Sequence, residues 1–103
     1  MSKNANQDIK QLSAIGHKLK PVVTIAGNGL SETVVAELNR ALDDHELIKV
    51  KLAVGSREAR SAIAAQMCER CGVQVVQAIG NIIIVLRRST QPDPRLSNLI
   101  RPL

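Results

Sequence analysis

The sequence contains no phenylalanine, tyrosine or tryptophan among its 103 residues. Many single-strand-binding and RNA-recognition domains hold bases by stacking them on aromatic rings, and that mode of recognition is excluded here. If the chain binds nucleic acid, the contacts must come from backbone amides, from lysine and arginine, and from the shape of the surface.

Long apolar runs are also absent. No stretch approaches the roughly 18 to 20 apolar residues that span a bilayer, and the first residues, MSKNANQDIKQ, carry no apolar segment after their charges. We therefore expect a cytoplasmic protein without a membrane partner. A length of 103 residues with 45% hydrophobic content is enough for one domain with a real core, and we expect it to be a monomer.

Cysteine is scarce, and the two present form the pair Cys68-Glu69-Arg70-Cys71. A redox pair is usually activated at a helix N-terminus, whereas this pair falls at the C-terminal end of an expected helix. A zinc site would need two more ligands, and neither His17 nor His45 has ligand-like spacing to the pair. Two reduced structural thiols are favoured, with no cofactor, no metal and no small-molecule substrate; a thiol-redox enzyme using Cys68 and Cys71 stays an alternative.

Acidic side chains are too few at both ends of the chain to balance the basic ones. The net charge is +5; residues 1–20 hold four lysines and one acidic residue, and residues 87–103 hold four arginines and one acidic residue. Residues 21–86 are nearly neutral, with six basic and seven acidic side chains. This distribution indicates a polyanionic partner such as nucleic acid, and an adaptor for an acidic protein stays a second alternative.

The spacing of apolar residues predicts the order α-β-α-β-α-β-β. Because helices separate the first strands and a two-residue turn at Gly80-Asn81 joins the last two, we expect a two-layer α/β domain with a small mixed four-stranded sheet. The predicted helices run from residue 8 to about residue 17, from residue 32 to a polar end at residues 43–46, and from residue 57 to residue 71. The predicted strands cover residues 22–25, 47–53, 73–79 and 82–86.

The first predicted strand ends in a loop with two glycines, within the string TIAGNGLS of residues 24–31. Ser31 is placed to cap the next helix, with Glu32 in its first turn. Backbone amides at such a helix start can receive a phosphate group. The spacing matches neither a P-loop nor a dinucleotide-binding motif, so a nucleotide cofactor is not expected, and a simple turn with positive φ stays the alternative.

Four strings of this sequence closely resemble the CRM domain family, named for chloroplast RNA splicing and ribosome maturation, and in particular its stand-alone bacterial YhbY-like members. The resemblance extends over about residues 8–88. The strings are HKLKPVV at residues 17–23, the loop leading into Gly29-Leu30, HELIKVK at residues 45–51 and VVQAIG at residues 75–80.

This resemblance implies an α/β domain similar to the C-terminal domain of a bacterial translation initiation factor, with a GxxG loop like that of KH domains. It implies a non-catalytic RNA-binding protein that associates with ribosomal RNA in precursors of the large ribosomal subunit. The domain then covers residues 8–88, between a flexible N-terminus (1–7) and a basic, flexible C-terminal tail (89–103) that holds three of the four prolines.

Carried onto this chain, the RNA-binding loop is Ala26-Gly27-Asn28-Gly29. The first glycine of the family pattern is Ala26 here, and Gly27 stands where a lysine is frequent. Near the hairpin, Asn81 and Leu86 likewise replace a frequent lysine and tyrosine. The positive charge is then expected from Lys18, Lys20, Lys49, Lys51, Arg87 and Arg88.

Overall fold

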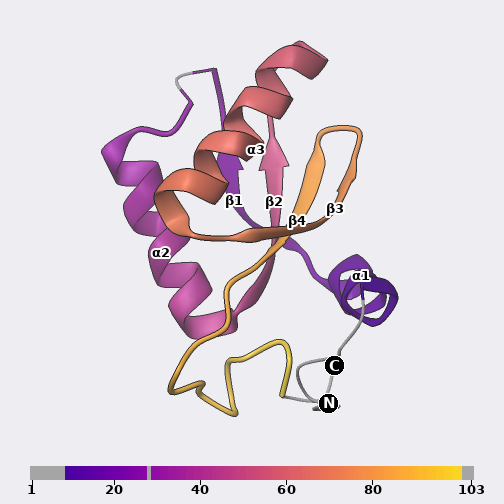
Figure 1. Ribbon diagram of the computed structural model, residues 1–103, viewed down its shortest axis with the longest axis vertical. Coiled ribbons are helices and arrows are strands. Elements are labelled where there is room, and N and C mark those ends of the chain that lie inside the picture. The colour runs from indigo at the N-terminus through magenta and orange to yellow at the C-terminus, as the bar shows by residue number, and fades with distance from the viewer. Residues whose placement is uncertain (1–8, 28, 101–103) are drawn as a thin grey trace.

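Seven helices and strands follow one another in the order that the sequence predicts (Figure 1). The structure, a computed structural model, describes residues 9–27 and 29–100. The elements are α1 (Ile9–Lys18), β1 (Pro21–Ile25), α2 (Glu32–His45), β2 (Leu47–Leu52), α3 (Arg57–Cys71), β3 (Gln74–Ile79) and β4 (Ile82–Leu86).

The strands form one mixed sheet in the order β1-β2-β4-β3. β1 and β2 are parallel, because α2 returns the chain to the same edge, while β4 runs antiparallel to both β2 and β3. The α/β class, the element order and the mixed four-stranded sheet are therefore confirmed.

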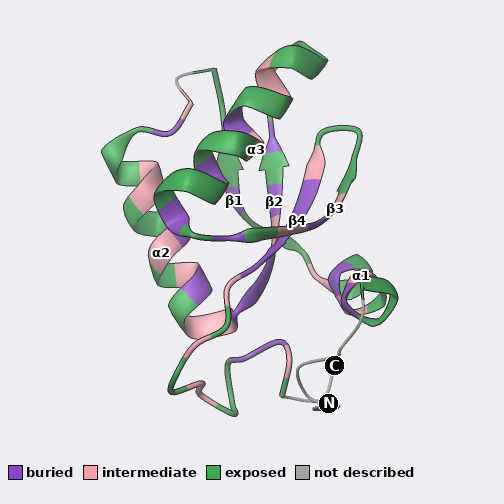
Figure 2. Ribbon diagram, viewed as in Figure 1, coloured by how far each residue is buried: buried purple, intermediate pink, exposed green. Residues whose placement is uncertain are grey.

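Helices cover both faces of this sheet. α2 and α3 pack on one face around Leu42, Met67 and Val50, and Figure 2 shows their buried positions turned toward the strands. α1 lies on the opposite face, where Leu12 contacts a smaller cluster that contains Ile84. The two-layer arrangement describes α2, α3 and the sheet, and α1 adds a partial third layer.

The helix ends follow the capping signals in the sequence. The Ser31 hydroxyl accepts a hydrogen bond from the Val34 amide at 3.2 Å, which confirms Ser31 as the cap of α2. Ser56 caps α3 in the same way, and Gly72 ends α3 with a φ of 65°. α2 and α3 consequently both begin at the edge of the sheet where β1 and β2 end.

Gly16 allows α1 to approach the sheet closely. A Cβ atom at this position would lie 2.7 Å from Cδ1 and 2.8 Å from Cγ2 of Ile84 in β4. A Cβ atom here would force the Ile84 side chain or α1 itself to shift, so Gly16 permits the close approach of α1 to the strands.

The C-terminal segment differs from the loosely held tail that its composition predicted. Residues 89–100 pass beneath the C-terminal end of α2 in Figure 1, and both Ser97 and Asn98 are buried there. The Ser97 hydroxyl donates to the buried Glu46 carboxylate at 2.6 Å, and the Asn98 amide donates to the Leu47 carbonyl at 2.7 Å. These bonds attach the segment to the junction of α2 and β2.

None of the helices within residues 9–27 and 29–100 is long and apolar enough to cross a membrane.

Candidate nucleic-acid interface

The glycine loop connects the end of β1 to the start of α2. Gly29 has a φ of 69°, a conformation that favours glycine, and its amide donates to the Ala26 carbonyl at 2.9 Å. Gly27 is exposed, with no neighbouring atom where a side chain would lie. Asn28, the fourth predicted loop residue, lies outside the described residues.

The first turn of α2 offers backbone donors next to this loop. The Val34 amide is used by the cap and the Val35 amide by the Ser31 carbonyl, but the amides of Glu32 and Thr33 have no acceptor among the described residues. Such amides, together with the positive end of the helix dipole, can hold a phosphate. The Glu32 carboxylate occupies the same turn and competes for this position.

Lys49 and Lys51 lie on the sheet face that α1 partly covers, because they alternate along β2 with core residues of the opposite face. Lys51 is paired with Thr24 and Lys49 with Pro21 of the neighbouring β1. The Lys49 ammonium donates to the His17 carbonyl at 3.2 Å, at the C-terminal end of α1. Lys51 is exposed nearer the end of β1, where the glycine loop begins.

Three of the predicted lysines gather at the other end of β1. Lys18, Lys20 and Lys49 line one cavity of about 300 Å³. His45 and Asn98 also line it, and the sequence did not assign them to this site. His45 Nδ1 lies 2.8 Å from the Leu96 carbonyl and so carries a proton for that bond. The docking of residues 96–98, which brings Asn98 here, has no signal in the sequence.

Neither of the two predicted arginines lines this cavity. Arg87 bridges α2 and the end of α3: its guanidinium donates to both the Oδ1 and the carbonyl oxygen of Asn39, to the Cys71 carbonyl and to Asp43, with distances of 2.7 to 3.1 Å. Arg87 therefore acts within the fold. Arg88 is exposed, just after β4.

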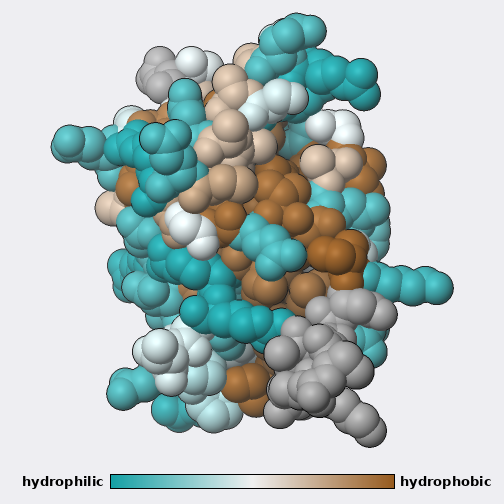
Figure 3. All heavy atoms as spheres, viewed as in Figure 1, coloured by the Kyte–Doolittle hydropathy of each residue, from teal (hydrophilic) through white to brown (hydrophobic). Residues whose placement is uncertain are grey.

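Two further arginines were not singled out from the sequence. Arg57 and Arg60 lie in the first turns of α3 and line a cavity of about 220 Å³ with Gly80 and Ile82 of the β3–β4 hairpin. Figure 3 shows apolar side chains between α3 and this hairpin, with hydrophilic ones at the margin. The three-residue spacing of the arginines at a helix start was visible in the sequence, but their closeness to the hairpin was not.

The two cysteines lack the geometry of a redox pair. Both thiols are free; Cys68 is exposed and Cys71 is buried at the C-terminal end of α3. Burial raises the pKa of the Cys71 thiol above its usual range, although the positive charges of Arg87 and Arg70 act in the opposite direction. Reactive thiolates require the opposite shift, so these contacts favour a structural role.

Known proteins with similar sequences are RNA-binding by name. A probable RNA-binding protein of Pseudomonas aeruginosa is 50% identical over 92 residues, which cover 89% of this chain and 88% of that protein. An RNA-binding protein of Haemophilus influenzae is 42% identical over 85 residues, or 82% of this chain and 86% of that protein.

A solved structure shares the fold. The solution structure of a hypothetical protein from Staphylococcus aureus matches with a TM-score of 0.72 at 24% identity, and the match covers 88% of this chain and 93% of that one. The CRS1 / YhbY (CRM) domain pattern matches residues 5–87. Together with the two relatives above, this match shows that the chain belongs to the CRS1 / YhbY (CRM) domain family.

Proposed function

We propose that this protein binds ribosomal RNA in precursors of the large ribosomal subunit and acts in subunit assembly without catalysis. The observation that carries the proposal is the cavity lined by Lys18, Lys20 and Lys49. Lys51 continues the basic surface along the same sheet face toward the glycine loop. The relatives named as RNA-binding proteins support RNA as the polyanion, and the YhbY-like resemblance supports ribosome assembly as the setting.

The proposed mechanism uses backbone contacts with RNA at both ends of β1. At one end, the amides of Glu32 and Thr33 and the positive end of the α2 dipole receive one phosphate beside the glycine loop. At the other end, the lysines neutralise neighbouring phosphates. A strand of five residues spans about 16 Å, so the interface covers several nucleotides. Because the chain has no aromatic side chains on which bases could stack, the protein selects its RNA partly by the shape of the folded RNA.

A matched pair of glycine substitutions tests the loop. Gly27 and Gly55 both have open space at the Cβ position and neither has a positive φ, so Gly27→Glu and Gly55→Glu add one carboxylate each without backbone strain. Fluorescence anisotropy with labelled large-subunit ribosomal RNA fragments measures the affinity. We expect Gly27→Glu to weaken binding by about tenfold, equivalent to about 1.4 kcal/mol, and Gly55→Glu to weaken it less. Equal effects of the two variants would remove the loop from the interface.

Sedimentation of a cell lysate tests the assembly role. The native protein should migrate with large-subunit precursors and should leave them after ribonuclease treatment. Migration at the top of the gradient, in cells that contain such precursors, would contradict the role in assembly. An association that survives ribonuclease would indicate a protein partner and favour the adaptor alternative.

A further inference from the structure

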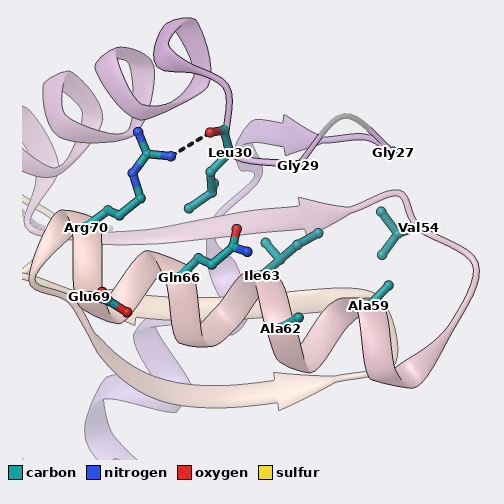
Figure 4. A pocket seen from close by; sticks show the side chains of 10 residues that line it. All are labelled: Gly27, Gly29, Leu30, Val54, Ala59, Ala62, Ile63, Gln66, Glu69 and Arg70. Atoms are coloured by element: carbon teal, nitrogen blue, oxygen red, sulfur yellow. Dashed lines mark hydrogen bonds between the residues drawn. The ribbon is translucent and has the colours of Figure 1, made fainter.

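A cleft of about 620 Å³ separates the glycine loop from α3 (Figure 4). The loop residues Gly27 and Gly29 form one wall, and Ala59, Ala62 and other α3 side chains form the other. The cleft lies at the edge of the sheet where β1 and β2 end. Its volume is within the range typical of small-ligand sites, roughly 300 to 1,000 Å³.

Aliphatic side chains and polar groups line the cleft in nearly equal measure. Leu30, Val54 and Ile63 line it together with the small alanine side chains of α3. Figure 4 shows Ile63 and Gln66 rising from α3 toward Leu30 and the loop, whereas Glu69 points away from the loop. This arrangement leaves an aliphatic surface with one neutral amide directed into the open space.

Gln66 is the polar group suited to a specific contact. Its side chain is exposed, and its amide, which offers both a donor and an acceptor, has no hydrogen-bond partner within the described residues. The amide of a glutamine can form two hydrogen bonds with a base edge that presents a donor next to an acceptor, as the edge of adenine does.

Arg70 holds the two walls of the cleft together. Its Nη1 donates to the Leu30 carbonyl at 2.6 Å, which ties the last turns of α3 to the residue before the α2 cap. The guanidinium has further N–H groups, and the Glu69 carboxylate, which carries the opposite charge, also lines the cleft. Arg70 is a positioning residue for the cleft, and its charge suits an occupant that belongs to a polyanion.

We propose that this cleft receives one unpaired nucleobase of the bound RNA, next to the phosphate held by the glycine loop. The proposal rests on the proposed RNA-binding function and goes beyond it, because the backbone contacts derived above do not distinguish one base from another. The occupant is argued from continuity: the loop that offers the phosphate site is also one wall of the cleft. The aliphatic surface contacts the face of the base, and Gln66 contacts its edge.

Two alanines on α3 provide a matched test. Ala62 lines the cleft and Ala65 does not, while both are exposed positions on the same helix. Ala62→Leu therefore fills the cleft, and Ala65→Leu adds the same side chain elsewhere. The probes are labelled single-stranded RNA octamers of adenosine, cytidine or uridine, together with an abasic octamer that has the same phosphates. Anisotropy at constant salt gives the affinity ratio between base-containing and abasic probes.

The wild-type protein should bind at least one base-containing octamer more tightly than the abasic octamer, by about fivefold or more. Ala62→Leu and Gln66→Ala should bring this ratio close to one, and Ala65→Leu should leave it unchanged. Equal binding of all probes by the wild type, or equal effects of the two leucine variants, would contradict the binding of a base in the cleft. Neither outcome would contradict the binding of the RNA backbone. No binding of any probe or ribosomal fragment would overturn the proposed function itself, and the cleft with it.

Discussion

Arg87 and Lys51 show how residues with the same charge can differ in role. Both were predicted from the sequence to contact RNA, but Arg87 is only 26% exposed in its side chain and donates to atoms of Asn39, Asp43 and Cys71. Lys51 is exposed and has no side-chain partner within the described residues. Charge patterns identify candidate cations, whereas the contacts of each side chain decide whether it faces a ligand or the fold.

The first prediction separates these two roles by substitution. Arg87→Ala should lower the free energy of unfolding by about 1–3 kcal/mol, because the Asn39 and Cys71 oxygens lose their donors. Lys51→Ala should change stability by less than about 0.5 kcal/mol and should weaken RNA binding severalfold. Urea denaturation and anisotropy on both variants measure this. If the Arg87→Ala protein were as stable as the wild type and bound RNA more weakly, Arg87 would contact RNA rather than stabilise the fold.

At the scale of elements, Gly16 determines how α1 meets β4. Alanine favours helix over glycine by about 1 kcal/mol, but its Cβ would lie 2.7 Å from the Ile84 side chain. Since overpacking costs about 1–3 kcal/mol, we expect Gly16→Ala to destabilise the protein in urea denaturation. Ile84→Val, which removes the nearest atom, should restore part of the loss in the double variant. Stabilisation by Gly16→Ala alone would contradict this packing.

The docking of the C-terminal segment depends on Glu46. This residue ends α2 with a φ of 63°, and its buried carboxylate accepts from the Ser97 hydroxyl at 2.6 Å and from the Ser89 amide at 2.6 Å. Ser97→Ala should cost about 1–3 kcal/mol in thermal or urea unfolding, because one buried carboxylate oxygen loses its donor. Thr90→Ala, at an exposed position of the same segment, is the control and should have almost no effect. Equal stability of the two variants would show that Glu46 does not hold the segment.

The sequence predicted the elements better than the contacts between them. Apolar spacing and capping residues such as Ser31 and Gly72 act locally, so the bounds of α3 agree with the expectation and no strand end differs by more than one residue. The docking of residues 89–100 depends instead on Glu46, which has a positive φ that is uncommon outside glycine, and on partners about 50 positions away. Such distant polar contacts leave no periodic pattern.

Those parts of the candidate interface that are local sequence patterns could be predicted, and those formed by contacts between separate elements could not. The glycine loop and the alternating Lys49 and Lys51 are local patterns, and their placement follows from strand geometry. The cavity that joins Lys18 and Lys20 to Asn98, and the cleft between the loop and Gln66, arise where separate elements pack. Their residues could be assigned only once the fold was known.

For the whole molecule, the excess positive charge makes the salt dependence of binding the broadest test. If the basic surface contacts about four to six phosphates of duplex RNA, a plot of log K against log salt should have a slope of roughly −3.5 to −5.5, and a shallower slope for single strands. Lys51→Ala should reduce the magnitude of the slope by about one unit or slightly less, since one phosphate contact is lost. Ala62→Leu should lower the affinity for base-containing RNA without changing the slope, because a base contact releases no counterions. Affinities that do not vary between low and moderate salt would contradict binding through phosphates. If Lys51→Ala and Ala62→Leu reduced the magnitude of the slope equally, the lysine surface and the cleft would not make different kinds of contact with RNA.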